Sequence, residues 1–443
     1  MTALPWTLRA LRPALSDQST SPSELADLAL SRSNQNPGRN TYLWQDPAWT
    51  RAEAARAASM PRGKGGPFGD GRSPLWGLPI SVKDCFDLAG TPTTCGTHLY
   101  RDLNGIVARD SWLVEQLRAL GAVIIGKSHL HPLAYGITGE NPEYGDCLQP
   151  GKPDSLTGGS SSGAVASLLE GSAVAAIGTD TGGSVRVPAA LGGLAGYRST
   201  LGRGDWRGGT HLSETFDTMG WLFRDIEDAP LLAAPFAPTK TAPIEKFSRF
   251  AIVPDSFLHD CDPQIIDSYH AMIRELEALG LSSHSIDTDW WADSIDIFAP
   301  IQASEAARLH AGRYHQFQTA IRERLEWGAS LTASDIAALR KRHVEFRDRM
   351  DELFAAHELL LMPSAPVLKI SPGDGETQKN TRTRLLRYTT PCSLACVPAV
   401  AIPCAQGGMQ LAAARDRDES LLALAGQIGA RRKAAGSAKS RRL

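Results

Sequence analysis

Two glycine-flanked serines and one lysine are the residues of this chain whose types and spacing favour nucleophilic chemistry. Ser160 lies in GGSSSG and Ser184 in GTDTGGSVRVPA, twenty-four residues further along. Each precedes a segment that predicts a helix, where unpaired N–H groups and the helix dipole favour negative charge. Lys83 ends the apolar run LPISVK, so burial would lower its pKa and provide a neutral amine. Such a base can activate a serine hydroxyl.

The elements that must hold these residues are indicated by hydrophobic periodicity and by turn residues. Ser161–Glu170 predicts a helix that Gly171 ends in a left-handed cap, and Ala173–Ile177 predicts a fully buried strand. Upstream, a helix that begins near Asp110 ends at Gly121, and a strand follows over Ala122–Ile125. This alternation of helices and strands is typical of an α/β sheet.

Three patterns admit other interpretations. Gly/Ser-rich runs are often flexible linkers, but the glycines here separate apolar elements that need burial. GAVIIGKS at 121–128 matches the P-loop pattern, yet its four central residues favour a strand and not a phosphate-binding turn. GSSSG at 159–163 matches the nucleophile elbow around Ser161, which would require a hydrophobic strand before it, and the preceding GKPDSLT is largely polar.

The segments GLPISVKD, GGSSSG and GTDTGGSVRVPA together resemble the amidase signature family, whose members include aryl acylamidases and urethane-cleaving amidases. The resemblance extends from about Ser21 to about Ile428. It implies that Ser184 is the nucleophile, Ser160 a bridging serine preceded by a cis peptide bond, and Lys83 the base. GKSH at 126–129 departs from the GKTN that the family usually carries.

The residues around this triad are expected to support the same chemistry. The oxyanion is expected to bind the backbone N–H groups of Thr181, Gly182, Gly183 and Ser184, because glycines allow close approach. Ser161, Asp180 and Arg186 are expected to support the site, the last two as an ion pair. The substrate pocket is expected along the loops 135–144 and 198–216 and part of 238–328, with Tyr135, Tyr144 and Phe216 as lining residues. No metal and no organic cofactor is expected.

Composition sets the wider limits. The chain has 443 residues, of which 42% are hydrophobic and 21% charged, as in globular enzymes. A net charge of −2 argues against nucleic-acid or membrane binding as a main role. The seven cysteines form no CxxC pair, which favours a reducing compartment, and residues 1–17 lack the apolar core of a signal peptide. We therefore expect a soluble cytoplasmic protein, as a monomer or homodimer.

The expected fold is a single large α/β domain over 1–430, with a central mixed twisted sheet covered by helices. Its signature core would span about 75–220 and its variable pocket region about 238–328. The sequence predicts one helix over 302–327, within that pocket region, and a second over 332–357, beyond it. Residues 431–443 carry six Lys and Arg and no acidic residue, and are expected to be a disordered tail.

Three functions stay open at this point. The first is a standalone hydrolase of small-molecule amides, which could also cleave esters or carbamates because all share an attackable acyl carbon. The second is the glutaminase-type component of a tRNA amidotransferase, its A chain, which needs partner proteins. The third is a catalytically inactive family member that acts as a binding protein. The sequence does not indicate the acyl or amine part of the substrate.

Overall fold

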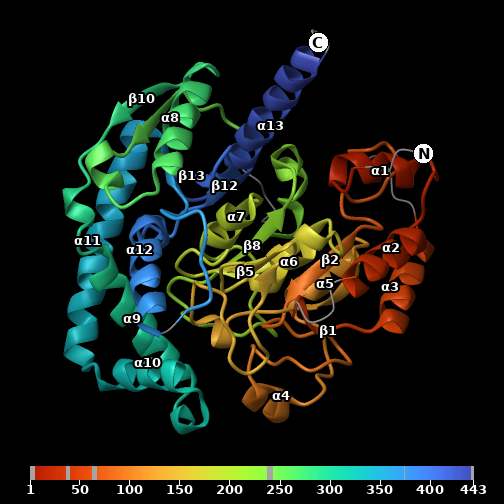
Figure 1. The fold of residues 1–443 in the computed structure, drawn as a ribbon, viewed down its shortest axis with the longest axis horizontal. Coiled ribbons are helices and arrows are strands. Elements are labelled where there is room, and N and C mark those ends of the chain that lie inside the picture. Colours follow the sequence, from red (N-terminus) through yellow and green to blue (C-terminus); the bar gives the residue numbers. More distant parts are fainter. Residues whose placement is uncertain (1–4, 36–39, 62–66, 237–242, 374, 441–443) are drawn as a thin grey trace.

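The computed structural model describes residues 5–35, 40–61, 67–236, 243–373 and 375–440, and one large mixed sheet runs through them. Figure 1 shows this sheet with helices packed around it. Its eleven strands follow the order β1-β3-β2-β6-β8-β7-β12-β13-β11-β9-β10. The expected single α/β domain with a central mixed sheet is confirmed. The strands are β1 (Tyr42–Trp44), β2 (Pro79–Lys83), β3 (Val123–Ser128), β6 (Ala175–Asp180), β7 (Ala195–Arg198), β8 (Thr218–Phe223), β9 (Arg249–Ile252), β10 (Ser282–Ser285), β11 (Leu359–Pro363), β12 (Ala399–Pro403) and β13 (Gly408–Ala413).

The strands β2 and β6 position the chemistry-bearing residues. They are parallel neighbours, with Val82 beside Ile177, and every residue of both strands is buried. Continuous burial on both faces explains the small and apolar residues that precede Lys83 in β2 and Thr179 in β6. Because parallel strands end at the same edge of a sheet, Lys83 at the end of β2 lies next to the turn that follows Asp180 at the end of β6.

Helices cover the sheet, and several match the periodicity of the sequence. Gly171 ends α6 in a left-handed conformation with φ +78°, and Thr332 caps α11 by accepting a hydrogen bond from the Asp335 N–H. The single helix expected over 302–327 is wrong: the chain forms two helices, separated by Gly312 at φ +78°. The helices are α1 (Leu8–Ser16), α2 (Pro22–Asn34), α3 (Pro47–Ser59), α4 (His98–Asn104), α5 (Trp112–Ala119), α6 (Ser162–Glu170), α7 (Arg186–Gly192), α8 (Pro263–Glu277), α9 (Ser294–Leu309), α10 (Thr319–Ser330), α11 (Ala333–His357), α12 (Gly375–Leu394) and α13 (Asp418–Ser440).

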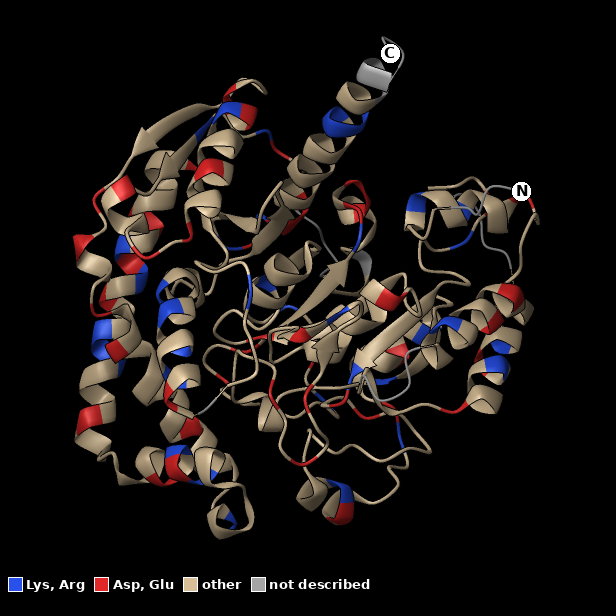
Figure 2. Cartoon of the chain, viewed as in Figure 1, with Lys and Arg blue, Asp and Glu red and all other residues tan. Residues whose placement is uncertain are grey.

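The C-terminal segment differs from the disordered tail that we expected. Helix α13 continues through Ser440, and Figure 2 marks basic residues in blue along it. Arg432 forms an ion pair with Glu275 at 2.8 Å, and Lys433 pairs with Asp225 at 2.5 Å. An alanine-rich sequence that extends an existing helix needs no new nucleation. The ion pairs of Arg432 and Lys433 stabilise the point where this extension begins. Residues 441–443 of the expected tail and 237–242 at the start of the pocket region lie outside the described residues. Among the helices that the structure describes, none combines the length and apolarity needed to cross a membrane.

Candidate active site

Lys83 lies fully buried at the end of β2, with its ammonium group surrounded by hydroxyls. Its Nζ donates hydrogen bonds to Ser160 Oγ at 2.7 Å and to Ser161 Oγ at 3.2 Å. A third bond, also of 2.7 Å, reaches Thr179 Oγ1 on β6. Burial lowers the pKa of Lys83 to about 8, although the nearby carboxylates of Asp217 and Asp180 act in the opposite direction. A neutral amine is therefore accessible close to neutral pH.

Ser160 lies in a loop that the backbone holds in place before α6 begins. The Gly159–Ser160 peptide bond is cis, as the family resemblance implies. The Ser160 carbonyl accepts a hydrogen bond from the His131 N–H at 3.1 Å, and the Gly159 N–H donates to the Ile137 carbonyl at 2.8 Å. A Cβ atom on Gly159 would lie only 2.8 Å from the Gly139 nitrogen, so this loop requires glycine.

Ser184 lies between β6 and α7 and is 5% exposed. It borders a narrow cavity of about 20 Å³, which is enough for one water molecule. Among the described residues, no hydrogen bond joins Ser184 Oγ to Ser160 Oγ, so the contact expected between the two serines is not formed in this structure. Catalytic hydrogen bonds of free enzymes often form only when substrate is bound.

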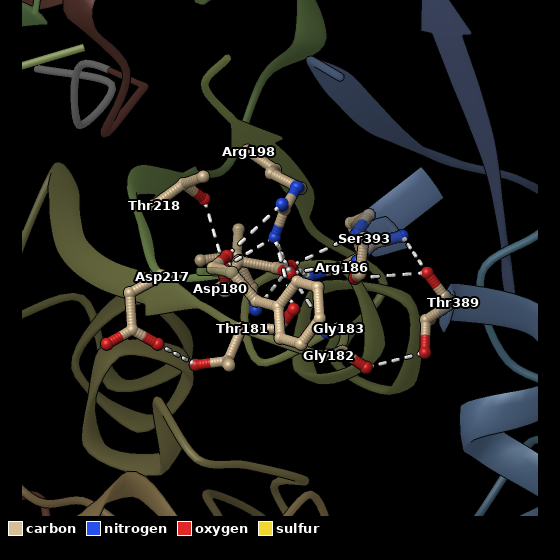
Figure 3. Close-up of polar contacts among 12 residues, drawn as sticks. Asp180, Thr181, Gly182, Gly183, Arg186, Arg198, Asp217, Thr218, Thr389 and Ser393 are labelled. Atoms are coloured by element: carbon tan, nitrogen blue, oxygen red, sulfur yellow. Dashed lines mark hydrogen bonds and ion pairs between the residues drawn. The ribbon is translucent and has the colours of Figure 1, made fainter. Parts of the chain in front are cut away.

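The turn that carries Ser184 is held by the buried carboxylate of Asp180 (Figure 3). Its oxygens accept from the Gly183 N–H at 2.9 Å and the Val185 N–H at 3.1 Å. Arg186 binds the same carboxylate at 2.8 and 3.0 Å, and Arg198 binds it at 2.9 Å. Burial alone would raise the pKa of Asp180, but the two arginines outweigh it and hold that pKa well below its usual range. The expected Asp180–Arg186 ion pair is thus present in the interior, not on the surface.

Arg186 also ties the turn to a distant part of the chain. Its guanidinium donates to the Thr389 carbonyl at 3.1 Å and to Ser393 Oγ at 2.9 Å, both on α12, and to Gln410 Oε1 at 2.8 Å on β13. Thr389 Oγ1 in turn donates to the Gly182 carbonyl at 2.5 Å (Figure 3). Helix α12 therefore helps to set the orientation of the peptide groups around Ser184.

The oxyanion site that we expected differs at one position. The Gly183 N–H already donates to Asp180, so it is not free to bind an oxyanion. In the part of the chain that the structure describes, the N–H groups of Thr181, Gly182 and Ser184 have no hydrogen-bond acceptor. Gly183 is needed for shape: its φ is +118°, and a Cβ atom there would lie 2.7 Å from Thr389. Of the four amides that we expected, three therefore remain without an acceptor among the described residues.

The two alternative motif interpretations do not fit the structure. Residues Val123–Ser128 of the P-loop pattern form the strand β3, and Lys127 Nζ forms a buried ion pair with Asp84 at 2.6 Å. Ser161 accepts from Lys83 and donates to the Thr179 carbonyl at 3.3 Å. Among the described residues, no histidine forms a hydrogen bond with its hydroxyl, as a nucleophile elbow would require.

A second, larger cavity of about 420 Å³ adjoins the narrow one. The two share Gly136, Ile137 and Arg382. Of the expected pocket residues, Tyr135 borders the narrow cavity, whereas Phe216 is fully buried with its ring 4.8 Å from that of Phe298. Tyr144 packs against His98 with ring centroids 4.7 Å apart, and is not among the residues lining either cavity within the described chain.

Some lining residues of the narrow cavity come from segments that we expected, and others do not. Leu212 belongs to the loop 198–216, and Gln302 to the region 238–328. Arg382 and Leu386 lie on α12, a segment that carried no signal of a pocket. Their only hint in the sequence is a run of four threonines and three arginines over 380–390, next to an apolar run that suggested an interior segment.

Comparison with known proteins supports the same picture. The family model described as Amidase matches residues 30–422. An indoleacetamide hydrolase of Pseudomonas savastanoi is 31% identical over 448 residues, covering 94% of each chain. The A chain of the glutamyl-tRNA(Gln) amidotransferase of Akkermansia muciniphila is 26% identical, covering 93% of this chain and 95% of the relative. A crystal structure of an amidase superposes with a TM-score of 0.84 at 28% identity, covering 96% of this chain and 99% of that one.

These matches span nearly the whole chain and include the segments that hold Lys83, Ser160 and Ser184. On this evidence the chain belongs to the amidase family and is an enzyme that hydrolyses carbon–nitrogen amide bonds.

Proposed function

We propose that this enzyme hydrolyses a small-molecule amide through a covalent acyl-enzyme on Ser184, with Ser160 and Lys83 as its proton relay. The observation that carries the proposal is the 2.7 Å hydrogen bond from the buried Lys83 Nζ to Ser160 Oγ, at the edge of the sheet where the Ser184 turn begins. A lysine whose pKa burial lowers to about 8 supplies the base that a serine nucleophile needs.

The steps follow from this geometry. Neutral Lys83 accepts a proton from Ser160, which accepts one from Ser184 as the Ser184 oxygen attacks the acyl carbon. The resulting oxyanion binds the free N–H groups of Thr181, Gly182 and Ser184, each of which contributes a factor of about 10²–10³ by analogy with other oxyanion sites. Ser160 then returns its proton to the departing amine. Water loses a proton to the same relay, attacks the acyl carbon and releases the acid.

Esters and carbamates present the same attackable carbon and are further substrates under this scheme. The narrow cavity at Ser184 leaves little room on its own side, so the longer part of a substrate must extend toward the 420 Å³ cavity. Every proton transfer in these steps uses a protein side chain or water.

The test is hydrolysis of a substrate panel by the purified chain. The panel contains an anilide, a fatty amide, a dicarboxylic monoamide, a carbamate and a urea. We expect turnover of at least one, and mass spectrometry of the quenched reaction should show an acyl group on the Ser184 peptide. Ser184→Ala should abolish both signals with an unchanged melting curve. Ser167→Ala is the matched control, because this buried serine of α6 bonds Ser81 and the Ala164 carbonyl instead.

Two other outcomes would replace the proposal. Hydrolysis of glutamine only in the presence of partner proteins would indicate the glutaminase-type component of a tRNA amidotransferase. A chain that binds these compounds without turnover would indicate an inactive binding protein.

A further inference from the structure

Two arginines from different helices meet at the cavities beside Ser184. Arg324 of α10 and Arg382 of α12 both line the larger cavity, and Arg382 also lines the narrow one. Their guanidinium carbons lie 5.4 and 6.0 Å from the centre of the Tyr135 ring. Arg324 also donates a hydrogen bond to the Tyr135 carbonyl. The fold therefore holds two like charges against one aromatic ring at the entrance to the site.

These charges have no carboxylate partner. Within the described residues, neither guanidinium lies within 4.0 Å of an Asp or Glu oxygen, and Arg382 makes no hydrogen bond. Burial and the neighbouring Arg382 lower the pKa of Arg324 to about 10, which reflects the cost of holding both charges there. Three arginines that are fully buried, by contrast, have carboxylate partners: Arg186 and Arg198 share Asp180, and Arg12 binds Asp70 at 2.9 Å.

The remaining charges of the larger cavity do not cancel this pair. Lys379 adds a third positive charge to its wall, whereas Glu140 and Asp146 contribute negative ones. Glu140 accepts a hydrogen bond from Thr138 Oγ1 at 3.0 Å, and Asp146 accepts from the Asn141 N–H at 3.0 Å. These bonds leave both carboxylates charged, and Glu140 acts on Arg324 by raising its pKa against the effect of burial. The wall of the larger cavity still carries three cationic side chains against two carboxylates, and Arg382 is the charged residue that it shares with the narrow cavity.

We propose that Arg324 and Arg382 bind a carboxylate of the substrate, so that the preferred substrates are amides whose acyl chain ends in a carboxylate. This inference rests on the proposed function, because it places the scissile amide at Ser184 in the narrow cavity and the acyl chain in the larger one. Guanidinium groups bind carboxylates through paired, charge-assisted hydrogen bonds, which neutral amides of the same length cannot form. Two half-buried guanidinium groups without a carboxylate within ion-pair distance are stabilised when such an anion enters.

The test compares matched substrates in one enzyme preparation. Succinamate, glutaramate and adipamate are each paired with the uncharged amide of equal chain length: butanamide, pentanamide and hexanamide. The readout is the ratio of kcat/KM for the charged member over its neutral partner. We expect a ratio of about 10² for at least one pair, on the scale of charged hydrogen bonds. Arg382→Met and Arg324→Met should each lower that ratio at least about tenfold.

Arg322→Met is the matched control. This partly exposed arginine lies on α10 as Arg324 does, lies 4.0 Å from Glu326, and does not line the cavity. Its ratio should equal that of the wild type. A ratio is measured within each variant, so partial loss of folded protein does not change it.

The outcomes separate this inference from the proposed function. Turnover of neutral amides with ratios near one, or a high ratio that persists in both arginine variants, overturns the carboxylate site and leaves the acyl-enzyme mechanism standing. If no amide is turned over, the binding of succinate and glutarate, measured by calorimetry, still tests the carboxylate site. Binding that both variants weaken at least about tenfold supports the site, whereas succinate and glutarate binding that is absent, or equal in wild type and variants, overturns it.

Discussion

The pH dependence of catalysis directly tests the proposal that Lys83 is the base. If Lys83 must be neutral to act, its pKa of about 8 means that about 9% of the enzyme is active at pH 7 and about 91% at pH 9. For a neutral amide, kcat/KM should therefore rise about tenfold from pH 7 along a single limb and level off near pH 9. A lysine with an ordinary pKa near 10.4 would leave the profile still climbing there.

The assay is kcat/KM on one neutral amide from about pH 6 to about pH 10 at constant ionic strength. Lys83→Met should remove the limb, with any residual rate following hydroxide. Replacements by glutamine at His129, His131, His211 and Glu170 serve as controls and should leave it in place. Burial lowers the pKa of His129 to about 4 and that of His131 well below its usual value, so both stay neutral. Burial raises the pKa of Glu170 to about 7, which makes it the control closest to the limb.

The same pKa predicts a change in stability, which provides a second readout. The fall from 10.5 to about 8 corresponds to about 3 kcal/mol. Between these two pH values the unfolded state binds more protons than the folded state, so this contribution to the free energy of unfolding increases with pH. The stability of wild type relative to Lys83→Met should thus rise by about 3 kcal/mol from pH 7 to pH 11, measured by urea unfolding. A limb that survives in Lys83→Met but disappears in a histidine or Glu170 variant would refute the assignment of Lys83 as base.

Three further predictions concern the surroundings of the relay. Ser160→Ala and Lys83→Met should each lower kcat/KM by about 10²–10⁴-fold, and the double variant should lose far less than the product because the two act as a unit; multiplicative losses would contradict a shared relay. Thr179→Val removes a hydroxyl that accepts from the Lys83 ammonium at 2.7 Å, so the pH limb should move below 8; an upward shift would show that this hydroxyl favours the neutral amine. Arg186→Met removes one of the two cations that bind the buried Asp180, so it should lower the free energy of unfolding, measured with urea, by about 3–5 kcal/mol. Arg308→Met breaks only an exposed ion pair with Glu214 and should lower that free energy by less than about 1 kcal/mol. Equal losses in the two arginine variants would contradict the structural role of Arg186.

Local sequence patterns were sufficient to place the buried strands and the tight turns that carry the candidate site. The apolar run before Lys83 and the strand before Asp180 are each bounded by turn residues, and two parallel strands must end at the same edge. The glycines around Ser160 and Ser184 mark backbone that side chains would block. The pairing of Lys83 with Ser160 was implied by the resemblance to the amidase signature family and not by these local patterns.

Contacts between distant segments could not be predicted in this way. Arg382 reaches the cavity of Ser184 across almost two hundred residues, and no periodicity in α12 distinguishes a cavity-lining arginine from an exposed one. The hydrogen bond from Gly183 to Asp180 depends on how one turn folds back on a carboxylate, which residue types alone do not specify. Phe216 looked like a pocket residue because it ends a polar loop, but its ring packs inward against Phe298.

The path of the chain around the cavities has a consequence for how such an enzyme can change. The proposed relay and the turn that holds it lie between residues 83 and 198, on strands at one part of the sheet. Much of the wall that faces the rest of a substrate comes from α9, α10 and α12, from residue 294 onward. Substitutions at these wall positions can alter the size and charge of the accepted molecule while the bond-breaking residues keep their own supports. Substrate choice and chemistry can then evolve almost independently. The exception is the hydrogen bonds that Arg186 and Thr389 form between α12 and the Ser184 turn, because a change in α12 that broke them would disturb substrate binding and chemistry together.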